Sequence, residues 1–444
     1  MKIAIFIVKK GGLKMLALLG FLTIGVFLYL ILSKRVSVIV ALILVPVVFS
    51  LFTGNFSELG NMILEGVSGV APTGIMLAFA ILFFGLMNKV GLFDPIISRV
   101  LKLVKGDPLK VVIGTAIIVM LTHLDGSGAS TFLITIPALL PLYEKLGMSR
   151  LVLAGVVALS AGTMNILPWG GPTARAATAL GVNATDLFNP VIPAMITGLV
   201  WVLFVSYLLG KRERERLGIQ DFEYDYKQEL SEEELKLRRP KLFWFNVVLT
   251  IVTLVALVQE WLPLPIIFMI AFAIALIVNY PNPKEQQDRV TEQATGVVTV
   301  VSIIFAAGIL TGVLSGTGMI EAMAETLVSI IPESAGTFMT LIVAITSMPL
   351  SLVFTPDAYY FGVLPVLSET ASAYGIPAVE IGRAAILGQM TVGFPLSPLT
   401  ASTFLLLGLA KVDLGDHQRF TFKWAFGTTI IMTIVAFITG AITI

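Results

Sequence analysis

The chain contains no cysteine, so it has no disulfide framework, no thiolate metal site and no cysteine nucleophile. Its two histidines, His123 and His417, are too few for a histidine-rich metal centre. The sequence also lacks the HExxH pattern of zinc peptidases and the GxSxG pattern of serine hydrolases. These absences argue against a membrane-embedded enzyme, and we expect no catalytic residue.

Charged residues are also scarce. They make up 13% of the chain, against about 25% in an average soluble domain. The 29 basic and 28 acidic residues nearly cancel, which argues against a nucleic-acid partner. Hydrophobic residues make up 57% and the mean hydropathy is +0.94, so the chain is predicted to be an integral membrane protein surrounded by lipid.

Long apolar runs predict where the chain crosses the membrane. The opening run, residues 3–8, is too short for a signal-peptide core, and two starts are compatible with the sequence, Met1 and Met15. Two amphipathic segments, 92–105 and 319–331, are expected to lie along the interface. The predicted spans are 15–32, 36–52, 70–88, 151–180, 188–210, 242–258, 262–280, 295–315, 378–410 and 420–443.

Most of the 29 lysines and arginines fall in linkers on one side of these spans. The linkers on the other side, 53–69, 181–190, 259–263, 316–333 and 366–377, contain none. The basic side is therefore predicted to be cytoplasmic, in a multi-pass protein of the cytoplasmic (inner) membrane. Segment 211–241 mixes both signs of charge, and we favour a solvated cytoplasmic linker over a regulatory platform.

The two halves of the chain repeat. Residues 15–52 align with 242–280, Gly85 with Gly312, and Pro137 with Pro365. The distribution of lysine and arginine predicts that the first spans of the two copies cross the membrane in opposite directions. The repeats, 15–210 and 242–444, are therefore predicted to be inverted. Inverted repeats that contain broken helices are typical of secondary transporters, and a passive channel fits them poorly.

Residues 121–131, LTHLDGSGAST, form a polar segment between the apolar flanks 111–121 and 132–142. Each flank, about 11 residues, makes roughly 16 Å of helix, about half a bilayer. The pattern predicts a re-entrant hairpin over 110–143 whose polar tip is buried in protein. A second hairpin is predicted over 336–368, with Thr355 and Asp357 at its tip.

Each tip carries one carboxylate, Asp125 or Asp357. A lone charge at mid-membrane costs at least ~2.5–3.5 kcal/mol. Such a residue is expected to bind a metal ion, carry a proton or pair with another group. The alternative for Asp125 is a helix cap or a pair with His123. His123 itself either titrates or serves as a packed, hydrogen-bonded side chain.

Two spans are predicted to break. In 151–180, Pro168, Gly170, Gly171 and Pro172 interrupt the helix, and a half-helix from Thr173 presents its N-terminus and Arg175 to the break. That combination suits a carboxylate, although Arg175 is alternatively an ion-pair partner of a tip aspartate. In 378–410 the break at 393–403 offers hydroxyls and free carbonyls, which suit Mg²⁺ or Ca²⁺.

These segments together resemble one known family. The opening MLALLGFLTIGVFLYLILSKRVSVIVALILVPVVF, the first tip HLDGSGASTFLIT, the break NILPWGGPTARAA and the second tip FTPDAYYFGVLP are similar to the citrate–metal:proton symporters (CitMHS) of the ion transporter superfamily. The resemblance runs over essentially the whole chain from Met15. It implies an all-α inverted-repeat transporter with two re-entrant hairpins and two broken helices. It also implies uptake of citrate complexed with a divalent cation, coupled to protons.

Relatives in the superfamily are homodimers in which a transport domain slides like an elevator against a scaffold. The hairpins and the spans 151–180 and 378–410 would form the moving part. Sodium-coupled dicarboxylate relatives carry Ser-Asn-Thr at their hairpin tips, and this chain does not, which argues against sodium coupling.

The predicted site has three groups of residues. Asp125 and Asp357 are assigned to the metal or the proton, with His123 as a further proton-coupling residue, and Arg175 is assigned to carboxylates. Ser127, Ser130, Thr131, Asn165, Gly170, Gly171, Thr173, Thr355, Ser397 and Thr400 complete the substrate site. No resident cofactor is expected, because Mg²⁺ or Ca²⁺ travels as cargo. The alternatives are another organic anion, such as a di- or tricarboxylate or a sugar acid, and a cation/proton antiporter on the same fold.

Overall fold

The computed structural model describes residues 2–54, 56–104, 106–220 and 232–443. Every element in these ranges is helical. The first half of the chain contains α1 (Lys2–Leu32), α2 (Val38–Ser50), α3 (Leu59–Lys89), α4 (Asp94–Val104), α5 (Pro108–Thr122), α6 (Gly128–Lys145), α7 (Arg150–Met164), α8 (Gly171–Leu180), α9 (Ala184–Phe188) and α10 (Ile192–Leu217).

The second half of the chain begins with a short helix α11 (Glu232–Leu237). It contains α12 (Phe243–Val258), α13 (Leu264–Asn279), α14 (Pro283–Gly316), α15 (Met319–Val328), α16 (Glu333–Gly336), α17 (Met339–Leu350), η5 (Ala358–Val363), α18 (Leu364–Ser372), α19 (Ala378–Ile386), α20 (Ala401–Ala410) and α21 (Leu414–Ile438).

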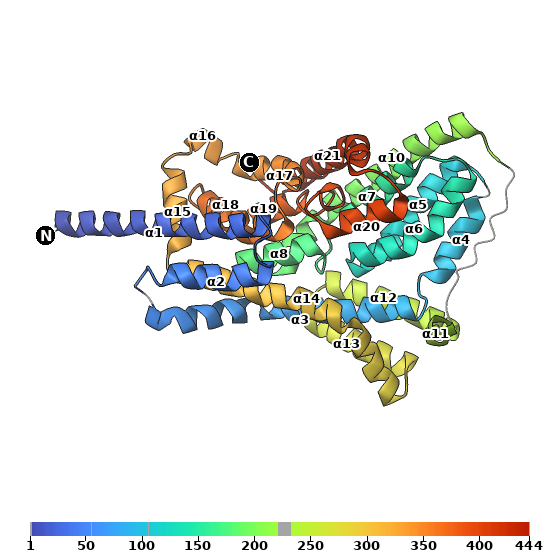
Figure 1. The fold of residues 1–444 in the computed structure, drawn as a ribbon, viewed down its shortest axis with the longest axis horizontal. Helices are drawn as coiled ribbons and strands as arrows, with labels where there is room; N and C mark the ends of the chain where they lie inside the picture. The colour runs from blue at the N-terminus through green and yellow to red at the C-terminus, as the bar shows by residue number, and fades with distance from the viewer. Residues whose placement is uncertain (1, 55, 105, 221–231, 444) are drawn as a thin grey trace.

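The long helices run roughly parallel (Figure 1). Seven helices in the described ranges are long and apolar enough to cross a membrane, and five shorter apolar helices accompany them. The amphipathic helices α4 and α15 run across the direction of α1, α3 and α14, as expected for segments at an interface (Figure 1). The protein is thus an all-α, multi-pass protein of the cell membrane.

The helices form two groups. Helices α2, α3 and α12 to α14 lie on one side, and the hairpins, the broken helices, α10 and α21 lie on the other (Figure 1). Helix α1 runs between them and contacts both α2 and η5 of the second hairpin. In the first group, α3 and α14 meet at Gly66, Gly308 and Gly312, where a Cβ on any of the three would collide with backbone of the facing helix. Small residues at such a spacing allow two membrane helices to approach closely. Both helices begin before the apolar runs 70–88 and 295–315, since apolar runs mark only the lipid-facing part of a helix.

The first hairpin is formed by α5, a single turn η2 (His123–Asp125) and α6. Its arms have 15 and 18 residues, so the hairpin extends from Pro108 to Lys145, two residues beyond the predicted bounds 110–143 at each end. The Asp107 side chain caps α5 and Pro108 occupies its first turn, which starts the helix before Lys110. At the other end, α6 continues through the polar Glu144 and Lys145.

The second broken helix also unwinds earlier than predicted. The break was expected at 393–403, but α19 ends at Ile386 and α20 begins at Ala401. Gly388 contacts α17 so closely that a Cβ would collide with the Ser347 hydroxyl. This tertiary contact sets the start of the break. No proline in the sequence marks the position, so the sequence does not predict it.

The charged segment 211–241 is anchored at both ends, and its residues 221–231 lie outside the described ranges. At the first end Arg214 donates two hydrogen bonds to Asp107, at 2.9 and 2.6 Å. At the second end Arg238 donates to the carbonyls of Asn88 and Lys89, at 2.7 and 2.8 Å. The described ends are therefore fixed by hydrogen bonds to residues of the first half of the chain, and the solvated linker stays a prediction.

Candidate functional site

The first hairpin tip is held by its own polar side chains. The Asp125 Oδ1 atom accepts the backbone N–H of Ser127 at 2.8 Å. Ser127 caps α6 by accepting the N–H of Ser130 at 3.3 Å, and the Thr131 hydroxyl donates to the Ser127 carbonyl at 2.9 Å. Gly126 between them has φ of 69°, a left-handed conformation that favours glycine. The Asp125 carboxylate therefore shapes the tip by holding the N–H of Ser127, and Ser127, not Asp125, is the residue that caps α6.

His123 connects this tip to the first broken helix. It is fully buried, with Nδ1 2.8 Å from the Thr131 hydroxyl and Nε2 3.4 Å from Asn165 Oδ1. The ring nitrogens thus contact Thr131 and Asn165, not Asp125. The pairing of His123 with Asp125, one of the sequence alternatives, is not what the structure shows.

The first break, between α7 and α8, contacts both the tip and the second break. The Trp169 indole N–H donates to the carbonyl of Leu124 at 2.8 Å. The Asn165 Nδ2 atom donates to the carbonyl of Met390, in the second break, at 2.7 Å. Asn165 therefore joins the two breaks, and Trp169 holds the turn that carries Asp125.

Trp169 also contacts the other group of helices. Its ring stacks on Phe84 of α3, with centroids 5.6 Å apart, and meets Phe268 of α13 edge-on at 5.3 Å. The first break thus packs on an aromatic surface formed by α3 and α13.

Close packing around the start of α8 explains why small residues occur there. A Cβ on Gly170 would collide with the Asn165 carbonyl, and one on Gly171 with the Met390 side chain. The Thr173 hydroxyl donates to the carbonyl of Ile166 at 2.6 Å and so secures the break to the half-helix. In this conformation the three residues serve packing and backbone geometry.

Arg175 and Asp357 form an ion pair. The Arg175 Nε donates to Asp357 Oδ1 at 2.7 Å, and the two side chains are only 16% and 13% exposed. Arg175 also donates from Nη1 to the Gly171 carbonyl at 3.3 Å. The second hairpin tip is therefore bound to the half-helix of the first repeat, the ion-pair alternative for Arg175.

The second tip and the second break interlock. The Thr355 hydroxyl caps the turn after it by accepting the N–H of Ala358 at 3.2 Å. The Tyr360 hydroxyl donates to the carbonyl of Gln389 at 2.8 Å. The Ser397 hydroxyl is buried and accepts the N–H of Leu399 at 3.2 Å, whereas the buried Thr400 Oγ1 has no hydrogen-bond partner in the ranges described.

Several residues at this centre were missed by the sequence analysis. Trp169 and Gln389 were not singled out, although a glutamine in the apolar run after α19 is a usable signal. His417, which was given no role either, lies buried in the first turn of α21 with Nε2 3.0 Å from the carbonyl of Pro395. It therefore supports the second break.

The structure brings both hairpin tips against the two breaks. The assignment of Asp125 and Asp357 to a metal ion stays a prediction. Among the described residues, no three or more His, Cys, Asp or Glu side chains come together as a metal-binding group.

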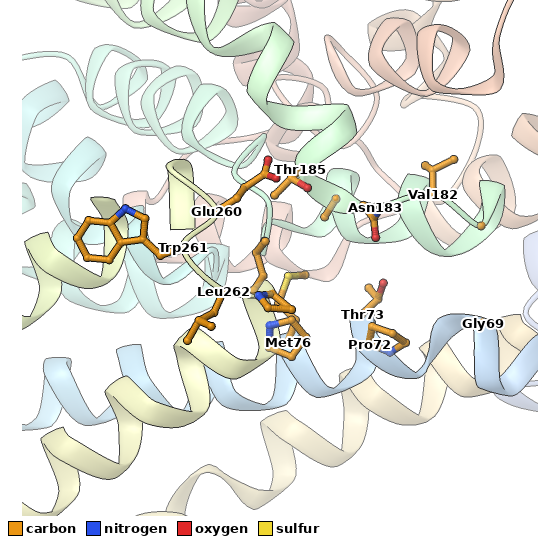
Figure 2. A pocket seen from close by; sticks show the side chains of 15 residues that line it. Gly69, Pro72, Thr73, Met76, Val182, Asn183, Thr185, Glu260, Trp261 and Leu262 are labelled. Carbon is orange, nitrogen blue, oxygen red and sulfur yellow. The ribbon is translucent and has the colours of Figure 1, made fainter. Parts of the chain in front are cut away.

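A separate cavity of about 500 Å³ lies at the C-terminal end of α8 (Figure 2). We call it the outer cavity, because it includes parts of the linkers 181–190 and 259–263, which contain no Lys or Arg. Thr73 of α3, Asn183 and Thr185 after α8, and Glu260 of the α12–α13 loop contribute polar atoms to it. The outer cavity thus lies between the two groups of helices, away from the N-terminal end of α8 that carries Arg175.

Solved structures support the fold. Over 86% of this chain, the Alcanivorax borkumensis YdaH transporter is similar with a TM-score of 0.56 and 15% identity, over 88% of its own chain. Neisseria gonorrhoeae MtrF, from a class of antimetabolite efflux pumps, is similar with a TM-score of 0.58 and 15% identity over 86% of this chain and 84% of its own. At this identity the likeness shows the fold alone.

Curated relatives are much more similar. A citrate transporter of Bacillus subtilis (strain 168) is 55% identical over 428 residues, which cover 96% of this chain and 100% of the relative. A Mg²⁺/citrate complex secondary transporter of the same organism is 48% identical over 433 residues, 97% of this chain and 100% of the relative. The CitMHS family model, described as citrate transporter, matches residues 27–388. The chain therefore belongs to the citrate transporter family CitMHS, a family of transporters and not of enzymes.

Proposed function

We propose that this protein is a symporter that imports citrate as a complex with a divalent metal ion, together with protons. The observation that carries the proposal is the ion pair between Arg175 and Asp357. It joins a permanent cation at the start of a half-helix to a carboxylate on a hairpin tip, and it lies beside both helix breaks.

This pair allows exchange between cargo and proton. Arg175 is a fork-shaped cation that suits a carboxylate of citrate as well as it suits Asp357. When a citrate carboxylate takes the place of Asp357, the Asp357 carboxylate loses its partner in a poorly solvated site. It then binds either a proton or the metal ion that arrives with the citrate, because an unpaired buried charge is costly. Binding of the anion and of the cation are thereby linked, each favouring the other.

The metal ion is held mainly by its own anion. Citrate offers carboxylate and hydroxyl oxygens, the hard ligands that Mg²⁺ and Ca²⁺ prefer. We assign the remaining contacts to Asp125 or Asp357. The hydroxyls of Ser127, Ser130, Thr131, Thr355, Ser397 and Thr400, the Asn165 amide, and the start of α8 from Gly170 to Thr173 complete the site in this proposal.

We further propose an elevator movement. The hairpins and broken helices would move as one body against α1 to α3 and α12 to α14, in a homodimer. Two features support this division. The contact of Trp169 with Phe84 and Phe268 is an aromatic surface without hydrogen bonds across it, which suits sliding. The outer cavity between the two groups has a volume that suits a small-molecule ligand.

Uptake of labelled citrate into proteoliposomes tests the proposal. The assay compares citrate alone with citrate plus Mg²⁺, Ca²⁺, Ni²⁺ or Zn²⁺, each with and without an imposed proton gradient. We expect uptake that needs a metal ion and accelerates with an inward proton gradient. Equal uptake without metal would overturn the metal-complex assignment, and no response to the gradient would overturn proton coupling. Uptake of another organic anion but not of citrate would favour the alternative transporter.

A further inference from the structure

A hydrogen bond from Ser351 orients the side-chain amide of Gln389. Gln389 lies in the second break and is fully buried. Its Oε1 accepts a hydrogen bond from the Ser351 hydroxyl at 2.7 Å. The same hydroxyl accepts the backbone N–H of Met390 at 3.3 Å, and its other acceptor, the Ser347 carbonyl, is farther away at 3.4 Å, so its hydrogen is directed to Oε1. The amide NH₂ group is thereby directed away from Ser351.

This NH₂ group is unpartnered. Throughout the described part of the chain, the Gln389 Nε2 atom has no hydrogen-bond partner. Buried polar groups in proteins are nearly always hydrogen-bonded, and an orphaned donor costs about 1–3 kcal/mol. The corresponding amide of the first break differs, because Asn165 uses both Oδ1 and Nδ2 in contacts with protein.

The backbone of Gln389 lies next to the proposed cargo site. The carbonyl of Gln389 accepts the hydroxyl of Tyr360, which follows Asp357 by one turn. The carbonyl of the next residue, Met390, accepts from Asn165. The backbone of Gln389 and Met390 therefore contacts both Tyr360, in the turn after Asp357, and Asn165, the residue that joins the two breaks.

We propose that the Gln389 side-chain NH₂ donates a hydrogen bond to a carboxylate of the cargo. Ser351 acts as the positioning residue that orients it. This inference rests on the proposed citrate transport and adds a specificity-determining residue to it. A site with an oriented amide donor discriminates against analogues that lack the acceptor, because its buried donor is then left unpaired.

The test measures citrate affinity in purified protein. Gln389→Met keeps the length of the side chain and removes the donor. The matched control is Gln418→Met, because the Gln418 Nε2 already donates to the Leu396 carbonyl at 2.8 Å. The dissociation constant of citrate with Mg²⁺ is measured by calorimetry, and the unfolding temperature of the ligand-free protein is measured in parallel.

We expect Gln389→Met to weaken citrate binding about tenfold or more, the effect of one hydrogen bond to a charged group. Its ligand-free unfolding temperature should change little, because the variant removes an unpaired donor together with the Oε1 acceptor of Ser351, and the Ser351 hydroxyl keeps the Ser347 carbonyl at 3.4 Å as an acceptor. Gln418→Met should lower the unfolding temperature and leave the dissociation constant unchanged. Gln389→Glu should bind more weakly still, since a carboxylate repels the cargo.

A wild-type dissociation constant in Gln389→Met would overturn the inference and assign the NH₂ group to a water molecule. If Gln389→Met fails to fold, Ser351→Ala serves instead. It frees the amide to rotate and should weaken binding severalfold, so wild-type affinity in Ser351→Ala would likewise overturn the inference. Failure of the proposed function looks different: the wild-type protein itself would not bind citrate with Mg²⁺.

Discussion

Asp357→Asn tests whether the tip aspartate competes with cargo for Arg175. The substitution keeps the shape of the side chain but removes its charge. Removing one partner of a buried ion pair costs about 3–5 kcal/mol, because the other charge is left unpaired. The two side chains keep 16% and 13% exposure, and Arg175 keeps its bond to Gly171. We therefore expect a loss of about 3 kcal/mol in the unfolding free energy of the ligand-free protein, near the lower end of that range.

The same reasoning predicts the effect on binding. In the wild-type protein a citrate carboxylate must displace Asp357 from Arg175, whereas in Asp357→Asn it meets an unpaired Arg175. Citrate should then recover the missing stabilisation, about 3 kcal/mol, or a roughly hundredfold gain in affinity for metal-free citrate. If the metal ion contacts Asp357, the additional gain from Mg²⁺ should disappear in the variant.

Thermal unfolding with citrate, with citrate plus Mg²⁺ and without ligand gives these quantities. Proteoliposome uptake at several pH values gives the coupling, which we expect the variant to lose. A variant that citrate no longer stabilises would refute competition and show that Asp357 contacts the anion complex directly. Proton-coupled uptake at the wild-type rate would remove Asp357 from the mechanism.

Three further predictions address other parts of the structure. Asp125→Asn should abolish coupled uptake but unfold at the wild-type temperature, since an asparagine oxygen still accepts the Ser127 N–H. Normal coupled uptake by this variant would show that Asp125 is not part of the site. Trp169→Phe keeps the ring contacts but loses the hydrogen bond to the Leu124 carbonyl. The unfolding free energy should therefore fall by about 1 kcal/mol, and uptake should slow. Unchanged uptake would contradict the role of Trp169 in holding the tip. Burial raises the pKa of Asp107, but hydrogen bonds from Arg214 and from the Leu109 N–H outweigh it, so the net pKa is lowered. The stability that Asp107 contributes is therefore present above its unfolded pKa of about 3.9 and lost as pH falls through the lower folded value. Asp107→Asn should lack this acid-dependent loss in unfolding scans, and an unchanged pH profile would refute the assignment.

The positions of the spans, hairpins and breaks follow from the sequence for a physical reason. A membrane admits only helices in contact with lipid, so apolar runs locate them, and polar or Pro-Gly interruptions locate irregular backbone. The tip at Asp125 and the break before α8 were predicted in this way, and the structure has both. Helix ends were less predictable. Caps such as Asp107 extend helices beyond the apolar run, and a close contact such as that at Gly388 shortens them.

The pattern of residues along the chain does not specify which side chains contact one another in the fold. The sequence left Arg175 between a substrate role and an ion pair, and only the packing of α8 against the second tip places it 2.7 Å from Asp357. In the same way it left open whether His123 pairs with Asp125, whereas the fold places its ring against Thr131 and Asn165.

The sequence by itself determined the membrane class and the polar segments that interrupt the apolar runs, because each depends on composition and spacing along the chain. The tertiary structure alone decided the partners of the polar groups. Hydrogen bonds and ion pairs between segments far apart in the sequence, such as that from Asn165 to Met390, depend on how the two repeats close on each other.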